Sequence, residues 1–560
     1  MKKQASVQES QQDLFETRWN TATVSAPTRA EPVQFNLDTY AGGTFRGKPI
    51  LGLEGVRDKI DAGVNDSVNG GVITYTFLDK DHLTGVYNNP KYGFTAGDGV
   101  GPFSDAQRAE ARQSIQFWDD LIAPRFVEKN GMGADIMFAN SADPAQAYAY
   151  YPGPGGQKYQ SDVFVADPSI NWTNAWLGFN GYGATTLIHE LGHAIGLSHP
   201  GNYNYDPNLP LSYGNYAEYA QDSEQYTIMS YWDPRETNAL IIDWNTLLYG
   251  NAQTPMLHDI YVIQEKYGAD LTTRAGDTVY GFNSTAGRDV FDFAANTAPN
   301  VAIYDAGGND TIDLSGFTAS TFLNLHAGTF SSAGQAAPSA AVVNANRADL
   351  SALSGQAFAP VSQATIDATA ASFQNAAAAR IAADTGVTGV TATEYDNLAI
   401  AYGTTIENGI GGSARDVLWG NQVANRLEGR GGNDVLNGFE GNDTLVGGAG
   451  NDRFDFTTAL GANNVDRIAD FAAGDKIGLG VATFAGVGTT VGAALSANAF
   501  WAGTAAHDAD DRIVYNQATG QLFYDADGNG SGAAQLFAQL TPGTALSAAD
   551  FVLVQTTPVY

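Results

Sequence analysis

A run of nine-residue units without gaps, beginning at Gly411, constrains the fold of this chain more than any other feature. The units are GGSARDVLW, GNQVANRLE, GRGGNDVLN, GFEGNDTLV and GGAGNDRFD. Their eighth position is always large and apolar: Leu418, Leu427, Leu436, Leu445 and Phe454. Their sixth position is always polar: Asp416, Asn425, Asp434, Asp443 and Asp452. A flexible linker of glycine and asparagine would not explain the apolar column, so we expect a regular repeat structure.

A parallel β-roll accounts for both patterns, the apolar eighth positions and the polar sixth positions. Each unit would supply a short strand whose eighth side chain points inward and a glycine-rich turn whose carboxylate points at calcium. Turns alternate sides, so each ion would lie between turns two units apart. The predicted calcium ligands of this array are Asp416, Asp434, Asp443 and Asp452. In the first two units Ala414 and Val423 replace the fourth-position glycine and Asn425 replaces aspartate, so calcium sites there are expected to be weaker or missing.

A second motif, HExxHxxGxxH, lies in the segment TTLIHELGHAIGLSHP as His189, Glu190, His193, Gly196 and His199. On a helix, His189 and His193 are one turn apart and face the same side, so two imidazole nitrogens can reach one zinc ion. Gly196 stands where a left-handed residue can end the helix and reverse the chain, which His199 needs in order to reach the same metal. Three protein nitrogens leave one zinc position open for water, as in catalytic zinc sites.

Glu190 follows the first ligand and is the expected general base, which takes a proton from the zinc-activated water and passes it to the leaving amine. HExxH alone arises by chance, but a glycine and a third histidine at fixed offsets reduce the chance to about one in ten thousand per chain. The remaining histidines have no such neighbours and are expected to be ordinary surface or core residues: His82, His258, His326 and His507.

Composition excludes several other functions. The chain has 560 residues, with 60 Asp and Glu against 28 Lys and Arg, and its formal charge of -32 would repel nucleic acid and anionic lipid. It has no cysteine, so disulfides, thiolate zinc ligands and a thiol nucleophile are excluded. We find no run of 18 apolar residues and no apolar stretch after the two N-terminal lysines, and we therefore expect neither membrane insertion nor a Sec-type signal.

The sequence pattern divides the chain into four parts. Residues 1–65 are polar and rich in turn formers, so we expect an N-terminal extension or propeptide whose removal keeps activity. Residues 66–266 have the alternating and helical patterns of an α+β catalytic domain, with strands at VITYTF and ADIMFAN and a helix over DAQRAEARQSIQFWDDLIAPRF that ends near Pro124. Residues 267–475 form the all-β roll, with an alanine-rich insertion at about 335–394 in which SFQNAAAARIAAD favours a helix. Residues 476–560 are a C-terminal β region.

HELGHAIGLSHP, followed by YTIMSYW thirty residues later, resembles the zinc site and Met-turn of metzincins, and among them the serralysin family. The resemblance implies a secreted zinc endopeptidase made as a zymogen, with Met229 beneath the zinc. Tyr231 would ligate zinc in the resting enzyme and hydrogen-bond the tetrahedral intermediate during catalysis. AYAYYPG at 147–153 resembles the family's edge strand, along which an extended substrate pairs through its backbone, so broad specificity is expected.

The resemblance also implies further calcium ligands, which would pin the roll to the catalytic domain. They are Arg274, Gly276 and Thr278 in TRAGDT, Asp305, Gly307, Gly308 and Asp310 in DAGGND, and Thr405 and Glu407 in TTIEN.

Serralysins leave bacteria through a type I exporter that recognises a C-terminal signal, and this implies an extracellular monomer that cuts protein substrates. ADFVLV resembles such a signal, although the added QTTPVY departs from the usual ending. Two alternatives remain open on the sequence: a dedicated processing protease for one surface partner, and a calcium-loaded adhesin without proteolysis. An intact Glu190 argues against the adhesin, because a binding platform has no need of a general base.

Overall fold

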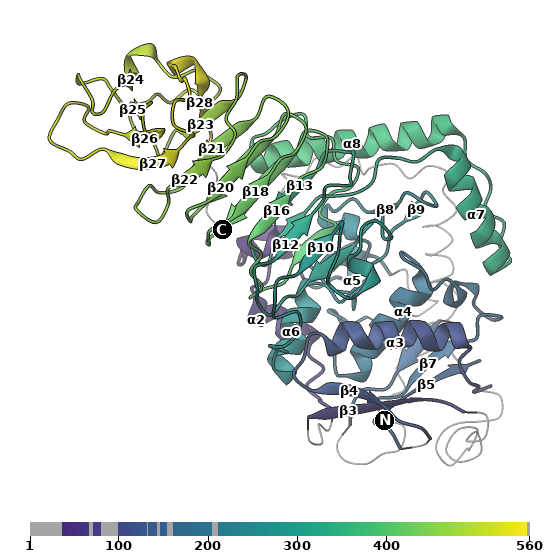
Figure 1. Cartoon of the computed structure of the whole chain (residues 1–560). Helices are drawn as coiled ribbons and strands as arrows, with labels where there is room; N and C mark the ends of the chain where they lie inside the picture. The colour runs from purple at the N-terminus through teal and green to yellow at the C-terminus, as the bar shows by residue number, and fades with distance from the viewer. Residues whose placement is uncertain are drawn as a thin grey trace.

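The computed structural model describes residues 36–66, 71–79, 99–131, 133–142, 146–153, 161–203 and 211–556. Figure 1 shows a sheet and its helices at the lower right, from which a long β-roll extends to the upper left. The predicted architecture, a mixed α/β part followed by a parallel β-roll, is confirmed. None of the helices in the described part of the chain has the length and apolar character needed to cross a bilayer.

The N-terminal part is built on a five-stranded sheet in the order β4-β3-β5-β7-β6. Its strands are β3 (Val72–Phe77), β4 (Arg125–Glu128), β5 (Ile136–Ser141), β6 (Ala147–Ala149) and β7 (Val163–Ala166). The strands pair in parallel except β6, which is antiparallel to β7 at one edge. Among the described residues no further strand pairs with β6 on its other side, as the addition of an extended peptide there requires.

Helix α3 (Asp105–Asp119) lies over this sheet beside α4 (Tyr182–Ala194) in Figure 1. Ser104 begins α3 with a capping box, because its hydroxyl accepts from the Gln107 amide while the Gln107 side chain accepts from the Ser104 amide. The helix ends five residues before Pro124, earlier than the sequence pattern indicated. Leu121 N–H already bonds to the Trp118 carbonyl in a tighter turn, so the helical pairing stops before the proline is reached.

Residues 36–65, which we expected to form an extension outside the core, pack inside it. This segment contains η1 (Leu37–Tyr40), β1 (Thr44–Phe45), β2 (Lys48–Pro49) and α2 (Leu53–Ile60). Its apolar side chains are almost fully buried: Leu37, Phe45, Ile50, Val56 and Ile60. Helix α2 contacts α6 (Leu257–Tyr267), the last helix of the N-terminal part. The prediction of an extension was therefore wrong for residues 36–65. The helices and strands of this segment are too short to show a hydrophobic periodicity in the sequence.

Two truncations test the role of this stretch. Deleting residues 1–65 should prevent cooperative folding, because five buried side chains at about 1.5–3 kcal/mol each exceed most of a typical domain stability. Deleting residues 1–35 removes none of these contacts, so this variant should unfold cooperatively and keep activity or gain it. Thermal unfolding and casein hydrolysis measure both. A fully active deletion of 1–65 would show that the packing of α2 is dispensable.

The β-roll consists of two facing parallel sheets with strands contributed alternately by successive repeat units. One sheet runs through β10 (Val279–Gly281), β12 (Thr311–Asp313), β16 (Asn408–Ile410), β18 (Arg426–Glu428), β20 (Thr444–Val446) and β22 (Asp466–Ile468). The other runs through β13 (Phe322–Asn324), β17 (Val417–Asn421), β19 (Val435–Phe439), β21 (Arg453–Phe456), β23 (Lys476–Gly480) and β28 (Phe551–Val554). The eighth-position side chains Leu418, Leu427, Leu436, Leu445 and Phe454 are all 0% exposed, so the apolar column forms the core between the sheets.

The insertion is helical, as SFQNAAAARIAAD predicted. It forms α7 (Ala340–Ser354) and α8 (Gln363–Thr385), which cross the upper right of Figure 1. Phe373 and Ile381 of α8 share a buried cluster with Trp244 of the N-terminal part and with Trp419 of the roll. The insertion therefore joins the two parts of the molecule rather than extending freely from them. Two further strands, β11 (Val301–Ile303) and β15 (Leu398–Ile400), pair in parallel, and β14 (Phe330–Ser331) completes their sheet.

The last part of the chain continues the roll. Strand β28 pairs in parallel with β23, and β27 (Gln535–Gln539) pairs with β22, so both roll sheets extend beyond residue 476. Strands β24 (Phe500–Ala502), β25 (Ile513–Asn516) and β26 (Gln521–Tyr524) complete the ten-stranded sheet. The strands expected from DRIVYN, QLFYDADG and ADFVLV are all present. Pairing across the 476 boundary means that the C-terminal region is not a separate sheet.

Candidate metal centre and calcium-binding repeats

Helix α4 carries the first two zinc-site histidines. Its Leu187 and Leu191 are buried, which fixes the helix in the core and leaves His189 and His193 on a shared side. The helix ends at Ala194 with Ile195 as its C-cap, and Gly196 then adopts φ of +99°. A Cβ atom at Gly196 would lie 2.2 Å from the Val64 carbonyl oxygen, so glycine is required both by conformation and by space. The resulting reversal returns His199 to the helix.

The three histidines converge through their Nε2 atoms. His199 Nε2 lies 3.3 Å from His189 Nε2 and 3.1 Å from His193 Nε2. Two nitrogens that each lie about 2.0–2.1 Å from a tetrahedral zinc ion are about 3.4 Å apart. The arrangement therefore has the dimensions of a three-histidine zinc site.

The other ring nitrogen of each histidine, Nδ1, donates a hydrogen bond to a backbone carbonyl. The Nδ1 atoms of His189 and His193 lie 2.7 Å from the carbonyl oxygens of Ile228 and Leu197, and His199 Nδ1 lies 3.2 Å from that of Tyr203. These bonds place the proton on Nδ1 and direct the Nε2 lone pair toward the metal. Burial lowers the pKa of His189 to about 4 and that of His193 well below its usual value. Both imidazoles are therefore neutral at pH 7, as metal ligation requires.

Glu190 is only 6% exposed, and its Oε2 atom is buried without a hydrogen-bond partner. Burial raises the pKa of this carboxyl to about 8. A divalent cation beside the group acts in the opposite direction, because positive charge favours the carboxylate. The site thus contains an acceptor that is not committed to any structural bond.

Met229 lies beneath the zinc-site helix. The side chain is fully buried, and its sulfur would be 2.6 Å from a Cβ atom at Gly192 of α4, so the helix and the turn touch at a glycine. Asp259 of α6 holds this turn, since its carboxylate accepts from the Thr227 hydroxyl at 2.5 Å and from the Ile228 amide at 2.7 Å. Sequence reasoning missed Asp259, because nothing in LHDIYVIQEKYG indicates a partner thirty residues earlier.

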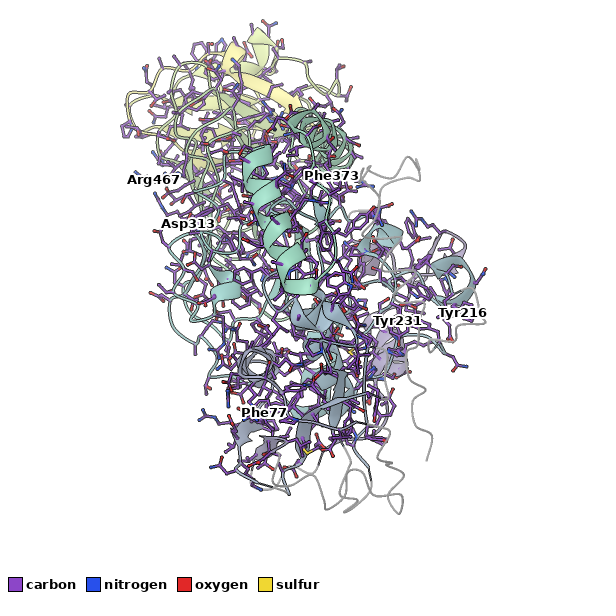
Figure 2. All side chains as sticks on the ribbon, turned by 90° about the vertical axis from the view of Figure 1, so that its right-hand side faces the viewer. Phe77, Tyr216, Tyr231, Asp313, Phe373 and Arg467 are labelled. Atoms are coloured by element: carbon purple, nitrogen blue, oxygen red, sulfur yellow. The ribbon has the colours of Figure 1, made fainter. Side chains whose placement is uncertain are left out.

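Tyr231 lies beside the histidines. Its ring centroid is 4.4 Å from that of His199 and 6.2 Å from that of His189. Burial and the neighbouring Glu190 raise the pKa of Tyr231 well above its usual value, so the phenol remains a hydrogen-bond donor at neutral pH. Figure 2 shows Tyr231 on the same side of the molecule as Tyr216 and below Phe373 of the insertion.

Asp222 is a second residue that sequence reasoning missed. It is fully buried, and its carboxylate accepts from Tyr203 Oη and Ser230 Oγ at 2.8 Å each and from Trp232 Nε1 at 3.1 Å. Since the Tyr203 carbonyl accepts from His199, Asp222 connects the third histidine to the turn that carries Met229 and Tyr231. Its pKa is raised to about 7 by burial.

The edge strand β6 is fastened to the zinc-site helix by Gln146. The Gln146 Nε2 atom donates to Thr186 Oγ1 of α4 at 2.9 Å and to Asn174 Oδ1 at 2.7 Å. Beyond the strand, the Tyr151 ring meets the edge of His193 with centroids 5.6 Å apart. An extended peptide paired with β6 would therefore run beside the histidines.

The repeat carboxylates form a ladder on each side of the roll. On one side the amide of each residue donates to the next carboxylate, from Thr321 to Asp416, Asp434, Asp452 and Asp475 at 2.6–2.9 Å. On the other side the same bonds join Thr278 to Asp310, Asp310 to Glu407, Asn425 to Asp443 and Asp443 to Asp466. Between Glu407 and Asn425 the direction changes, because Asn425 Nδ2 donates to the Glu407 carbonyl oxygen at 3.1 Å. In Asp310, Asp434, Asp443 and Asp452 the Oδ1 atom accepts a backbone hydrogen bond. The Oδ2 atoms of these four residues are buried and have no partner among the described residues.

Burial raises the pKa of these carboxyls, and repulsion from neighbouring carboxylates adds to the effect at Asp310, Asp434 and Asp443. The values are about 7 for Asp416, Asp310 and Asp466, about 8 for Asp434 and about 9 for Asp443. The roll therefore concentrates unpaired buried oxygens where a hard cation would satisfy them. Asp466 and Asp475 join the ladders although the sequence analysis did not include them, because their separation from the preceding carboxylate is 23 residues instead of 18.

The ligands inferred from the family resemblance lie at the start of the roll. Asp305, Asp310 and Glu407 are mutually close, with the Asp310 amide donating to Glu407 Oε2 at 2.7 Å. Gly308 has φ of +152°, and a Cβ atom there would be 2.7 Å from Asp310 Oδ1 and from the Gly276 carbonyl oxygen, to which Thr278 Oγ1 donates. Gly307 N–H donates to Asp305 Oδ1. The Thr404 hydroxyl accepts from the Asp305 amide at 3.1 Å, and the role of the next residue, Thr405, as a calcium ligand stays a prediction.

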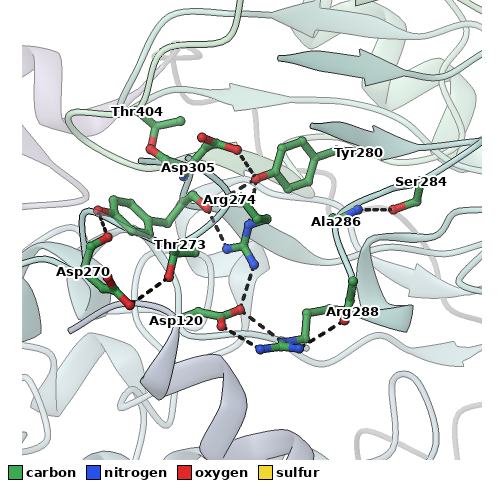
Figure 3. A network of polar contacts seen from close by, with 12 residues as sticks. Asp120, Asp270, Thr273, Arg274, Tyr280, Ser284, Ala286, Arg288, Asp305 and Thr404 are labelled. Carbon is green, nitrogen blue, oxygen red and sulfur yellow. Dashed lines mark hydrogen bonds and ion pairs between the residues drawn. The ribbon is translucent and has the colours of Figure 1, made fainter. Parts of the chain in front are cut away.

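Arg274 uses its guanidinium for packing between the two parts of the molecule. Figure 3 shows it joining Asp120, at the end of α3, to Tyr280 of the roll, while Arg288 donates to both oxygens of Asp120. The guanidinium is cationic, and each of its nitrogens donates a hydrogen bond within the protein. The predicted calcium ligand at Arg274 is therefore its carbonyl oxygen.

The other histidines have varied surroundings. His258 is buried against Asp38, and His326 is buried with its Nδ1 atom 2.9 Å from Asn324 Oδ1. His507 is half exposed and lies between Asp508 and Asp511, with ligand atoms within 4.8 Å of one another. His82 lies outside the described residues.

Comparisons with known proteins agree with this geometry. Residues 269–352 match the family model described as Peptidase M10 serralysin C terminal, and residues 419–454 match the RTX calcium-binding nonapeptide repeat. The chain is 33% identical to a metallopeptidase AprA of Pseudomonas marginalis over 91% of this chain and 94% of that protein. It is 35% identical to a metalloprotease AprA of Pseudomonas entomophila over 82% and 81% of the two chains. It is also 40% identical to a serralysin of Proteus mirabilis over 41% and 49%.

The RTX repeats and the three-histidine site agree with calcium and zinc as its metals, and the relatives agree with a secreted enzyme. The chain is a metalloendopeptidase that belongs to the serralysin family.

Proposed function

We propose that this protein is an extracellular endopeptidase of broad specificity that hydrolyses internal peptide bonds with Glu190 as general base. The convergence of three histidine nitrogens beside a buried Glu190 oxygen that has no hydrogen-bond partner among the described residues is the observation that carries the proposal. Zinc held by His189, His193 and His199 would supply a Lewis acid and would lower the pKa of a bound water to about 7. The hydrogen bonds from their Nδ1 atoms to backbone carbonyls would hold the three imidazole rings in the orientation that ligation requires.

Glu190 would accept the proton of the attacking water and deliver it to the leaving amine. Its Oε2 atom has no hydrogen-bond donor among the described residues, so this oxygen is available for both transfers. Tyr231 would donate its phenolic proton as a hydrogen bond to the oxyanion that develops on the scissile carbonyl. Strand β6 would align the substrate backbone, and because backbone pairing recognises few side chains, many sequences would be cut.

Cleavage of a denatured proteome tests the breadth of specificity. We expect many cleavage sites and casein hydrolysis that is lost with a zinc chelator. Cleavage at one bond in a single native target, with poor casein hydrolysis, would instead favour a dedicated processing protease.

Tyr231→Phe should reduce kcat by about 10² with little change in KM, because a donor engaged mainly in the transition state contributes little to ground-state binding. The substitution removes only the hydroxyl and keeps the ring packed against His199. Steady-state kinetics on a fluorogenic peptide measure the effect, and Tyr216→Phe, at a half-buried tyrosine of the same aromatic cluster, is the matched control for loss of a phenol. An unchanged kcat would reduce Tyr231 to a structural part of the turn.

We also propose that the protein is a monomer exported by a type I system that recognises its C-terminal region. The support is its membership of the serralysin family together with the buried carboxylates, which oppose folding of the roll where calcium is scarce. Co-expression with a type I exporter should release the protein to the medium, and deletion of 476–560 should retain it in the cell. Light scattering of the secreted protein tests the monomer.

A further inference from the structure

Glu394 is a buried carboxylate without any visible partner. It follows the insertion, is 0% exposed, and neither of its oxygens has a hydrogen-bond partner. The carboxylate lies against the bare backbone of Gly334, where a Cβ atom would be 3.2 Å from Glu394 Cδ. Among the described residues no basic side chain forms an ion pair with it. An isolated buried carboxylate costs several kcal/mol, so this group requires a compensating partner.

A second buried carboxylate adds to that requirement. Asp243 of β8 (Ile242–Asp243) is 4% exposed and lies close enough to contribute to the raised pKa of Glu394, although burial is the larger cause. Asp243 accepts from the Asn245 amide at 3.0 Å and from Thr246 Oγ1 at 2.6 Å. These donors are neutral, so they leave the combined negative charge in place.

The surrounding polar atoms are oxygens and amides from four segments that meet here, at Asn245, Thr297, Gln335 and Thr393. Asn245 Oδ1 accepts from Gln335 Nε2 at 3.2 Å, and Asn245 Nδ2 donates to Thr297 Oγ1 at 3.1 Å. Thr393 Oγ1 donates to the Gln335 carbonyl oxygen at 2.9 Å. Both ends of the insertion, at 335 and 394, therefore lie beside the loop that follows Asp243.

We propose that Glu394 and Asp243 bind one calcium ion at this junction, outside the roll. Two carboxylates without a counter-charge favour a divalent cation, and an all-oxygen donor set favours a hard one. Calcium fits better than magnesium, because it accepts irregular geometry and a bidentate carboxylate, whereas magnesium requires near-octahedral ligands and retains its waters.

An ion here fastens the insertion to the catalytic part of the chain. Trp244, next to Asp243, packs against Phe373 of α8 with centroids 5.8 Å apart. Asp396, two residues after Glu394, accepts from Gln225 Nε2 at 3.3 Å, and Gln225 leads directly into the turn that carries Met229. Calcium bound by Glu394 thus orders a segment in contact with the floor of the zinc site, independently of the repeats.

Replacing the carboxylates by amides distinguishes a bound cation from a protonated acid. If calcium is bound, Glu394→Gln and Asp243→Asn each lose one calcium equivalent per chain while zinc content is kept, and each lowers Tm in saturating calcium. If no cation is bound, the neutral amide relieves a buried charge, so calcium content stays unchanged and Tm is unchanged or higher, which overturns the proposal. Asp367→Asn, at an exposed carboxylate of α8, is the matched control and should change neither quantity.

Terbium luminescence gives a second measurement in case an amide variant fails to fold, which loss of zinc would reveal. Tb³⁺ replaces calcium, and an indole close to it sensitises its emission. Trp244→Phe in the otherwise intact chain should lower the sensitised emission, because Trp244 adjoins Asp243 and its Nε1 atom has no hydrogen bond to lose. Emission equal to that of the wild type would overturn the proposal.

Discussion

Replacing Glu190 with alanine is expected to abolish nearly all casein hydrolysis while the fold and the zinc content persist. The three histidines keep their Nδ1 bonds to the carbonyls of Ile228, Leu197 and Tyr203, none of which involves Glu190. The variant loses only the acceptor for the water proton, and general-base catalysis contributes about 10²–10⁴ in rate. Residual turnover above about a tenth of the wild type would show that another group is the base.

Glu190→Gln and Glu110→Gln refine this test. Burial alone raises the pKa of both carboxyls, to about 8 for Glu190 and about 7 for Glu110 of α3, but only Glu190 adjoins the histidines. We expect Glu190→Gln to be as inactive as the alanine variant and Glu110→Gln to retain full activity. Equal losses in both variants would indicate that buried charge, rather than proton transfer, determines the rate.

Glu190→Gln is expected to raise the stability of the zinc-free protein, although it lowers activity. The folded-state pKa of Glu190 is raised above its unfolded value, so in zinc-free protein its contribution is fully present below about pH 4.5 and is lost as pH rises through about 8. Glu190→Gln should therefore raise the Tm of the zinc-free protein at pH 8 and leave it nearly unchanged at pH 4. This combination of lower activity and higher stability identifies a functional carboxylate.

The sequence predicted those parts of the molecule that are governed by local periodicity. The nine-residue phase gave the inward column from Leu418 to Phe454, and the HExxHxxGxxH spacing gave the three converging histidines, because a helix and a strict repeat fix geometry over short distances. The ladder carboxylates Asp466 and Asp475 were missed where five extra residues break the phase.

Other parts depend on contacts between distant segments. Asp222 and Asp259 act on the zinc site through hydrogen bonds that only the folded chain creates, and no spacing rule connects them to the histidines. Strand β28 pairs with β23 after about seventy intervening residues, so the sequence pattern indicated a strand without its partner. Helix α2 has only eight residues and contains a glycine, which gave it no clear helical period.

Removing calcium is expected to unfold the roll at neutral pH. Asp416, Asp434 and Asp452 lie in one ladder, and the unpartnered Oδ2 atoms of Asp434 and Asp452 have no compensating donor without a cation. The apolar core contributes one large side chain per repeat unit, so it is too thin to offset this charge. Calcium bound only by the folded state stabilises by about 2.7 kcal/mol per site at a hundred times its Kd.

The pH dependence of the calcium-free roll follows from the raised pKa values of Asp416, Asp434, Asp443 and Asp466. Each folded-state pKa lies above the unfolded value of 3.8, so the folded roll binds more protons than the unfolded chain between about pH 4 and pH 7–9. Stability without calcium is therefore greatest at low pH and falls as pH rises through this window. In chelator, the roll should retain more β structure at pH 5 than at pH 8.

The full-length chain is the right material for this experiment, because β17 pairs with β13 and Trp419 packs on Phe322 from outside the repeat array. Trp419 is 2% exposed within β17, so the fluorescence difference between wild type and Trp419→Phe reports burial in the roll itself.

At pH 8 in chelator we expect Trp419 emission to shift to longer wavelength and the β contribution to circular dichroism to fall, and millimolar calcium should reverse both. Asp434→Asn removes one repulsive charge together with one ligand, so it should fold more readily in chelator yet gain less from calcium. A buried Trp419 and unchanged circular dichroism in chelator at pH 8 would show that the apolar column holds the roll without calcium.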